Sequence, residues 1–219
     1  LFRSMSIHVL ENFIKINDIV KKLSNKVNII AVTKTFPLDI VNSLIKYGHL
    51  HYGESKVLEA ISKWSHLLKV NNEIKLHMIG HLQSNKAKEA ISIFNYIHSL
   101  DSEKLANILS KEEKIANKRI KYFIQVNLGD EKQKFGISIN LVDDFIRYTK
   151  NDLNLDVIGL MCIPPISSNS KSFFLTLKKI AEKNNLQELS MGMSSDYIDA
   201  IDSGATFIRI GSAIFGKRT

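Results

Sequence analysis

The feature that most constrains the fold is a regular alternation of short apolar runs with longer stretches that carry apolar residues at helical spacing. The runs of strand length cover residues 27–33, 50–53, 75–80, 96–100, 120–128, 157–163, 189–191 and 206–210. The first run has no polar alternation, which is typical of a parallel strand buried on both faces. Eight strands, each followed by a helix or turn, predict a closed (β/α)8 TIM barrel. A doubly wound open sheet is the structural alternative.

Residues at the predicted helix ends support this division of the chain. Pro37 suits the start of a helix and Gly48 suits its end. Ser102, Asn140 and Ser194 stand where hydroxyl or amide side chains cap helix N-termini. The sequence therefore predicts three capped helices, after the fourth, fifth and seventh strands.

The segment before the first strand is predicted to form an additional helix. It carries an apolar stripe made of Ile7, Leu10, Ile14 and Ile19, and it could cover one end of the barrel. No linker or low-complexity segment interrupts the chain, so we expect residues 1–219 to form a single domain. Met5 is taken as the natural start, with residues 1–4 as a remnant of cloning.

Composition excludes several classes of protein. The 219 residues are 44% hydrophobic and 24% charged, as in ordinary globular proteins. The single cysteine, Cys162, allows no internal disulfide, which fits a reducing compartment and a cytoplasmic protein. We expect Cys162 to be an inert thiol in the core. No apolar run approaches the roughly 18 residues of a membrane span.

The net charge of +8 is compatible with nucleic-acid binding, but the lysines are spread over the whole chain. Their densest group, residues 111–121, is interleaved with Glu112 and Glu113. The charge therefore favours a basic surface that attracts anionic ligands, with a nucleic-acid-binding protein as a less favoured alternative.

Lys34 is the first candidate for chemistry, because it lies one residue beyond the first apolar run. Active sites of TIM barrels lie at the carboxyl ends of the strands. Desolvation there lowers the pKa of a lysine ammonium and leaves an amine that can form imines with aldehydes. A solvated lysine on a rim loop is the alternative.

Two donor clusters follow the last two strands. Gly192-Met193-Ser194-Ser195-Asp196 follows the seventh, and Arg209-Ile210-Gly211-Ser212-Ala213 ends the eighth. The glycine of the first cluster would let backbone approach a ligand, and the loops after strands seven and eight commonly bind phosphate. An imine-forming lysine and a phosphate cradle are what pyridoxal 5′-phosphate (PLP) requires.

Six segments then resemble the pyridoxal phosphate homeostasis proteins, the YggS/PROSC family, over essentially the whole chain. They occur in the family's order and are AVTKT at 31–35, YGES at 52–55, HMIGHLQSNK at 77–86, GLM at 159–161, MGMS at 191–194 and RIGSAIFG at 209–216. The resemblance implies the barrel of the alanine racemase N-terminal domain. It also implies an intracellular role in PLP (vitamin B6) homeostasis without clear catalysis.

The same resemblance implies which residues contact the cofactor. PLP would form a Schiff base with Lys34, and its phosphate would be bound by Ser194, Gly211 and Ser212. Arg209 would lie near the pyridine nitrogen. The remaining predicted contacts are Ser55, Ile79 and Met193. Ser55 and His81 depart from the usual asparagine and proline of the family, so the contact from Ser55 is in doubt.

Other residues predict no further site. His77 and His81 are four apart on a predicted strand and turn, and no cysteine or carboxylate completes a zinc set, so no metal is expected. Lys132 and Lys134 are interpreted as a solvated loop. No catalytic residue is assigned, because no second acid or base can be placed opposite Lys34. A racemase-like PLP enzyme is the alternative function. PLP-dependent apoenzymes are the expected partners, and a monomer is the expected assembly.

Overall fold

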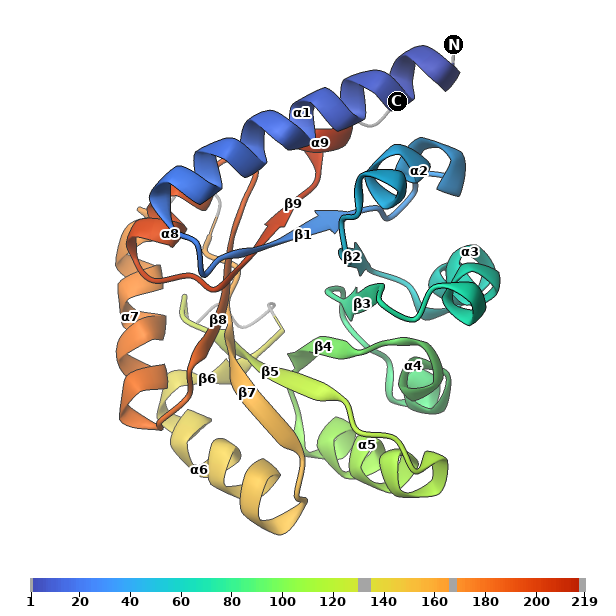
Figure 1. The fold of residues 1–219 in the computed structure, drawn as a ribbon. Helices are drawn as coiled ribbons and strands as arrows, with labels where there is room; N and C mark the ends of the chain where they lie inside the picture. Colours follow the sequence, from blue (N-terminus) through green and yellow to red (C-terminus); the bar gives the residue numbers. More distant parts are fainter. Residues whose placement is uncertain (1, 130–134, 166–168, 217–219) are drawn as a thin grey trace.

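Eight parallel strands close into a ring in the computed structural model, which describes residues 2–129, 135–165 and 169–216. Each strand pairs with the next, and pairing of β1 with β9 and of β4 with β5 closes the ring. The prediction of a TIM barrel is therefore confirmed, and the open-sheet alternative is wrong. Figure 1 looks onto one end of the barrel. The ring consists of β1 (Asn28–Val32), β2 (His51–Glu54), β3 (Lys75–Met78), β4 (Tyr96–Leu100), β5 (Lys121–Asn127), β7 (Asp156–Met161), β8 (Glu188–Met193) and β9 (Phe207–Ile210).

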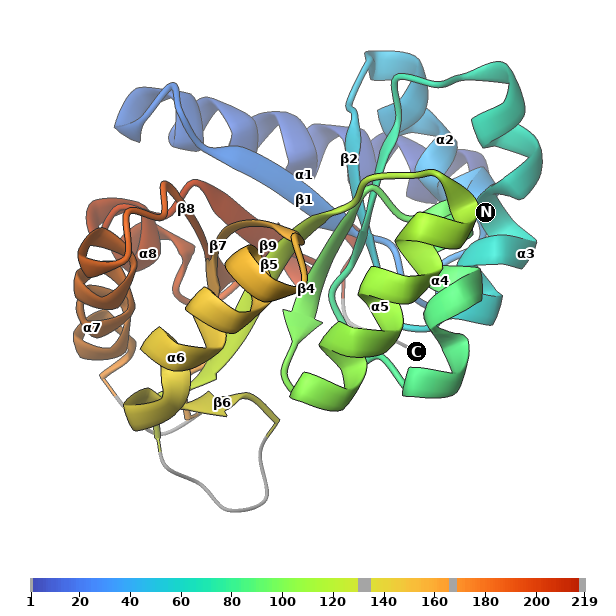
Figure 2. The same ribbon diagram turned by 90° about the horizontal axis from the view of Figure 1, so that it is seen from below.

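Helices surround the strands on the outside, as Figures 1 and 2 show. A short additional strand, β6 (Ile137–Ser138), pairs with the end of β5 outside the ring and was not predicted. The helical segments after β1 are α2 (Leu38–Tyr47), α3 (Val57–Val70), η1 (Ser84–Lys86), α4 (Ala87–Ile93), α5 (Glu103–Ala116), η2 (Ile139–Leu141), α6 (Val142–Arg147), η3 (Tyr148–Asp152), α7 (Ser170–Lys183), α8 (Tyr197–Asp202) and α9 (Ser212–Phe215).

The first helix, α1 (Phe2–Leu23), lies along the side of the barrel and not over its end (Figure 1). It packs against α2, α8 and α9, so it fills the outer layer beside the four-residue α9. Its buried face consists of Val9, Phe13, Ile16 and Val20, whereas Ile7 and Ile19 are exposed. The predicted stripe was therefore right for Leu10, which packs against the core, and wrong for Ile7 and Ile19, because both faces of this helix carry apolar residues. Among the described residues, no helix is both long and apolar enough to cross a membrane.

The capping predictions had mixed outcomes. Gly48 ends α2 in the left-handed conformation at a φ of 92°, and the Ser102 hydroxyl accepts the Leu105 N–H at the start of α5. Asn140 caps no helix, because residues 139–141 form a 3₁₀ turn and α6 begins only after Leu141. The prediction for Ser194 is also wrong, for a reason that concerns the candidate site.

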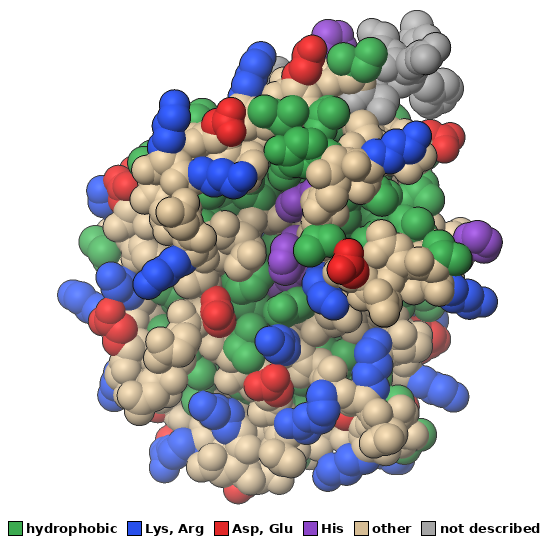
Figure 3. Space-filling view, viewed as in Figure 1, with side chains coloured by type: hydrophobic (Ala, Val, Ile, Leu, Met, Phe, Trp, Pro, Cys, Tyr) green, Lys and Arg blue, Asp and Glu red, His purple; other side chains and the backbone are tan. Residues whose placement is uncertain are grey.

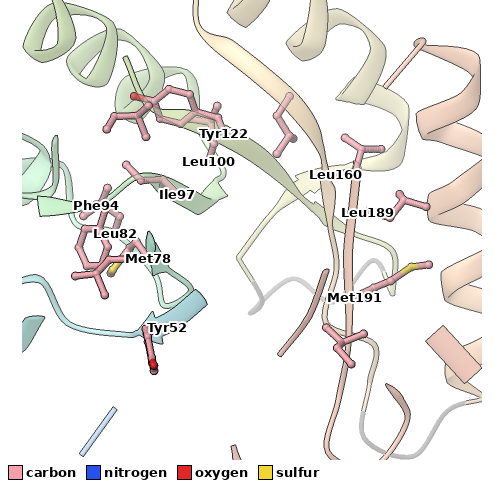
Figure 4. Packing of buried hydrophobic residues seen from close by; sticks show 14 of the residues in the cluster. Tyr52, Met78, Leu82, Phe94, Ile97, Leu100, Tyr122, Leu160, Leu189 and Met191 are labelled. Carbon is pink, nitrogen blue, oxygen red and sulfur yellow. The ribbon is translucent and has the colours of Figure 1, made fainter. Parts of the chain in front are cut away.

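The core has two layers, one on each face of the strands. The larger layer lies between the strands and the helices and contains side chains from nearly every element. Figure 4 shows part of it, including Tyr122, Leu160 and Leu189. The smaller layer fills the inside of the ring with Ile30, Phe123, Met161 and Phe207. Since parallel strands alternate their side chains between two faces, the two layers keep the ring and the helices in a fixed arrangement.

Histidines share the inside of the ring with these apolar side chains. His77 and His98 are fully buried, and their rings stack on Tyr96 at 4.2 Å and on Phe123 at 4.3 Å between centroids. Burial holds the pKa of both well below the ordinary value, with neighbouring histidines adding to the effect at His77 and Arg209 and His51 adding to it at His98. His49 and His51 are half-buried, and burial lowers the pKa of each to about 4. The barrel therefore contains neutral imidazoles where most TIM barrels have branched apolar residues.

These buried histidines make the fold sensitive to acid. The unfolded chain binds a proton on each histidine near pH 6.5, whereas the folded chain keeps His77 and His98 neutral, so stability falls as the pH drops below that value. We expect the free energy of unfolding to decrease by about 1 kcal/mol for each of these two histidines between about pH 7.5 and pH 5.5. Urea denaturation at both pH values measures the loss.

Two variants identify the source of this loss of stability at low pH. His98→Gln should remove about half of the loss assigned to this pair, whereas replacement of the exposed His66 by Gln should leave the loss unchanged. Equal stability of the unsubstituted protein at both pH values would contradict the assignment.

Candidate cofactor-binding site

A cavity of about 390 Å³ lies at the carboxyl ends of the strands. Seven of the eight residues predicted to contact a cofactor line it, so the folded chain brings together side chains that are up to 178 positions apart, from Lys34 to Ser212. The eighth, Ser55, lines a neighbouring hollow of about 590 Å³ that also borders Lys34. The residues that line the first cavity are Val32, Lys34, Phe36, Ile79, Ile163, Met193, Ser194, Ser195, Arg209, Gly211, Ser212 and Gly216.

Lys34 is half-buried, and the residues on both sides of it are anchored to β2 and α3. The Thr33 hydroxyl donates to the Glu54 carboxylate at 2.7 Å, and the Thr35 N–H donates to Glu59 at 2.7 Å. Thr35 has a φ of 71°, a left-handed conformation that a β-branched residue rarely adopts. The surrounding bonds must therefore hold this turn against local strain, which fixes the position from which Lys34 extends.

Lys63 on α3 connects these anchors. Its ammonium donates to the Thr33 carbonyl and to Glu54, both at 2.9 Å, and to Glu59 at 3.3 Å. Glu54 is completely buried and also accepts the Trp64 indole N–H at 2.9 Å. Burial acts to raise the pKa of Glu59, but the Thr35 N–H and Lys63 outweigh it and the pKa is lowered. Lys63 thus joins two glutamates and the backbone beside Lys34 into one hydrogen-bonded cluster.

Ser194 connects the two donor clusters and does not cap a helix. Its Oγ accepts the N–H groups of Gly211 at 3.3 Å and Ala213 at 3.2 Å. Asp196 precedes α8 instead, and its carboxylate accepts the Met193 N–H at 2.7 Å. Ser194 lies only two positions before Asp196, so the spacing in the sequence could not show which of the two precedes the helix. The result is a continuous cradle built from the loops after β8 and β9.

The cradle presents unused donors to the cavity. Over the ranges that the structure describes, the amides of Ser195 and Ser212 and the Ser212 hydroxyl donate to no protein acceptor. Such groups bind anions, phosphate above all. Gly192 has a different role from the predicted one, because a Cβ there would lie 2.5 Å from the Ala200 side chain. This glycine allows close packing on α8 and does not line the cavity.

Arg209 places a positive charge inside the barrel at the base of the cavity. It is only 5% exposed, donates to the Ser190 hydroxyl at 2.7 Å and to the Cys162 carbonyl at 2.9 Å, and forms no ion pair with a described residue. Arginine stays charged in proteins, so its remaining N–H groups favour an electron-rich ligand. Cys162 contributes only its carbonyl, because burial raises the pKa of its thiol to about 12.

Sequence reasoning missed several lining residues. Phe36, Ile163 and Val32 follow or end strands, so the rule that located Lys34 could have found them. Phe36 also stacks on Phe215 at 4.9 Å, which links the loop after β1 to α9. His81 bonds Asp101 at 3.1 Å and stacks on Phe135, and neither contact had a sequence signal.

The residues present fit PLP. An amine, a cluster of amide and hydroxyl donors and an apolar wall from Val32, Ile79 and Met193 surround a space of suitable size. Within the described ranges, no group of three or more His, Cys, Asp or Glu side chains is arranged to hold a metal ion. The predicted loop lysines Lys132 and Lys134 lie outside the described residues.

The fold and the cavity define a barrel protein with a lysine beside an anion cradle. Residues 10–219 match the family of the alanine racemase N-terminal domain. The pyridoxal phosphate homeostasis protein of Pasteurella multocida is 33% identical over 90% of this chain and 89% of its own. The protein of the same name from Synechocystis is 35% identical over 92% and 96%. The chain therefore belongs to the pyridoxal phosphate homeostasis proteins, within the alanine racemase N-terminal domain family.

Solved structures agree. PipY of Synechococcus elongatus, in a structure with PLP bound, is 31% identical and superimposes with a TM-score of 0.86 over 95% of this chain and all of its own. Alanine racemase of Corynebacterium glutamicum is 15% identical with a TM-score of 0.70, over 96% of this chain and 61% of its own. The second likeness shows the fold alone.

The cluster behind Lys34 predicts a large effect for one remote substitution. Lys63→Met leaves the buried Glu54 carboxylate without its cation, so we expect a loss of about 3–5 kcal/mol in the free energy of unfolding. The turn that presents Lys34 should loosen as well. Urea denaturation measures the first effect, and PLP affinity measures the second.

Lys69→Met is the matched control, because Lys69 lies exposed on the same helix. It should change stability by less than about 0.5 kcal/mol. Similar stabilities for the two variants would show that the buried pair does not hold the turn.

Proposed function

We propose that this protein binds PLP as a Schiff base on Lys34 and serves in intracellular PLP homeostasis. The observation that carries the proposal is the cavity that Lys34 shares with Ser194, Gly211 and Ser212. The cofactor's aldehyde supplies imine chemistry with amines when it is bound. The related pyridoxal phosphate homeostasis proteins and the PLP-bound PipY structure support the same cofactor.

The residues of the cavity have separate roles in this proposal. Lys34 provides the covalent link, and the cradle of Ser194, Gly211 and Ser212 binds the phosphate. Ile79 and Met193 contact the ring, while Ser55, in the neighbouring hollow, is a weaker candidate for contact. Release takes place when an incoming amine displaces Lys34 from the cofactor.

Arg209 argues for binding without catalysis. A permanently charged guanidinium near the pyridine nitrogen opposes protonation of that nitrogen, which makes the ring a poorer electron sink. Among the described residues that line the cavity, Lys34 is the only side chain suited to general acid–base chemistry. The homologues are named as homeostasis proteins. We therefore infer a carrier or reservoir that is not an enzyme.

The remaining parts of the proposal concern context. We infer a single barrel domain that acts as a monomer in the cytoplasm and transfers PLP to apoenzymes. A solitary buried cysteine supports a reducing compartment. No nucleic-acid or membrane surface is assigned, since the lysines are spread over the whole sequence.

Removal of the Lys34 amine tests the covalent link. Purified protein mixed with PLP should show the visible absorption band of a Schiff base, and Lys34→Ala should abolish it. Lys56→Ala is the matched control, because Lys56 is an exposed lysine that borders only the neighbouring hollow. A band that persists in Lys34→Ala, or disappears in Lys56→Ala, would refute the assignment.

Proton exchange tests the absence of catalysis. Protein loaded with PLP is incubated with single-enantiomer amino acids in heavy water, and deuterium at Cα is measured by mass spectrometry. We expect no incorporation above that given by PLP alone. Incorporation that disappears in Lys34→Ala would establish the racemase-like enzyme in place of the carrier.

A further inference from the structure

A continuous line of hydrogen-bonded side chains crosses the inside of the barrel from Arg209 to His51. Arg209 bonds the Ser190 hydroxyl at 2.7 Å, and that hydroxyl contacts His98 Nδ1 at 2.8 Å. His98 Nε2 lies 2.9 Å from His77 Nδ1, and His77 Nε2 lies 2.9 Å from His51 Nδ1. We call Ser190, His98, His77 and His51 the histidine chain. Its members come from β8, β4, β3 and β2.

The histidine chain begins beside Arg209 at the cavity and ends at the opposite side of the barrel. Ser190, His77 and His98 are buried, whereas His51 is half-buried at the first position of β2. Figure 3 shows histidine side chains near the centre of the face that is viewed in Figure 1, where the strands begin. The buried chain therefore spans the inside of the ring and has one end near solvent.

Arg209 fixes the direction of every bond in the chain. A guanidinium has donors and no acceptor, so the Ser190 Oγ must accept from it. The proton of this buried hydroxyl also needs an acceptor, and among the described residues His98 Nδ1 is the only other partner. The hydroxyl therefore donates to His98. A neutral imidazole that accepts at Nδ1 carries its proton on Nε2. His98 then donates to His77, and His77 donates to His51, by the same rule.

The direction requires neutral rings, since a protonated imidazole has no acceptor nitrogen. Complete burial keeps the pKa of His77 and His98 well below the ordinary value, and Arg209 adds to this effect at His98. The stacked neighbours Tyr96 and Phe123 restrict rotation of the two rings. The chain is therefore fixed in both geometry and proton position.

We propose that Ser190 and His98 are positioning residues that fix the orientation of Arg209 toward the cofactor. In this proposal the histidine chain is held in one direction, with His98, His77 and His51 each protonated on Nε2. The Ser190 hydroxyl and the Cys162 carbonyl are the two acceptors that fix the plane of the guanidinium. His98 Nδ1 accepts a hydrogen bond from the Ser190 hydroxyl and so keeps the oxygen lone pairs of that hydroxyl turned toward Arg209. The part that concerns the cofactor rests on the proposed function, whereas the proton positions do not.

Nuclear magnetic resonance on the full chain without PLP tests the proton positions. Protein with ¹⁵N-labelled histidine is examined by long-range ¹H–¹⁵N correlation, which distinguishes the two tautomers. We expect the Nε2–H form for His51, His77 and His98 at neutral pH, with each ring assigned through its correlations to the backbone of the same residue in the unsubstituted protein. An Nδ1–H form at His98 in the unsubstituted protein would overturn the proposal, and this measurement depends on no variant that could fail to fold.

Removal of the fixed donor gives a second readout. Arg209→Met leaves Ser190 free to donate or accept, so a mixture of tautomers is expected at His98. Ser99→Ala is the matched control, since Ser99 is buried next to His98 on β4 and its hydroxyl has no partner among the described residues. Unchanged tautomers in Arg209→Met show that Arg209 does not set the direction.

PLP binding tests the positioning role. Ser190→Ala should weaken PLP affinity about tenfold, the order expected for a lost hydrogen bond to a charged group, and shift the visible band. Ser190→Thr, which restores the hydroxyl, should recover both, and Ser99→Ala should change neither. If Ser190→Ala binds PLP like Ser99→Ala, the positioning role is wrong while the Schiff base on Lys34 stands. If the unsubstituted protein binds no PLP, the proposed function fails, and the tautomer measurement alone then tests the direction of the histidine chain.

Discussion

The pairing of the first strand with the last determines where everything in the candidate site lies. β1 and β9 are adjacent with Ile30 opposite Arg209 and Ala31 opposite Ile210. Lys34, two residues after β1, and Gly211, directly after β9, therefore emerge at the same end of the barrel and line one cavity. Because a shift of one residue would turn each side chain to the other face, the apolar faces of both strands enforce this register. The amine and the anion cradle meet as a consequence of closing the barrel.

Closure also explains why the barrel tolerates a buried charge. A lone arginine inside an apolar core would be costly, and no carboxylate contacts Arg209 within the described residues. The Ser190 hydroxyl and the Cys162 carbonyl solvate it instead, and the histidines extend that polar path through the ring. The same low dielectric that makes the charge costly makes each of these bonds strong. The interior is therefore ordered by directional bonds as well as by packing.

The sequence was sufficient for the barrel and for most of the cavity. Periodicity identified all eight ring strands, because strands buried on two faces form apolar runs, and strand ends located Lys34 and Arg209. Periodicity could not find β6, which is two residues long, nor the buried face of α1, where both faces are apolar. It also could not separate Ser194 from Asp196 as the residue before α8, because both side chains accept amide protons. Only the three-dimensional arrangement showed which backbone amides lie within hydrogen-bonding distance of each side chain.

The histidine chain illustrates a different limit. His51, His77 and His98 stand 26 and 21 positions apart, so no local pattern relates them, and each alone resembles a core histidine. Their meeting depends on the register of three neighbouring strands, in which His51 pairs with Lys75 and His77 pairs with Tyr96. Each histidine therefore lies two positions farther along its strand than the residue paired with the histidine before it. In the direction that Arg209 imposes, each bond donates away from the cavity, so the chain at rest has no proton to offer a reaction there. An interior that holds Arg209 but supplies no proton fits the proposed PLP carrier better than it fits a racemase-like enzyme.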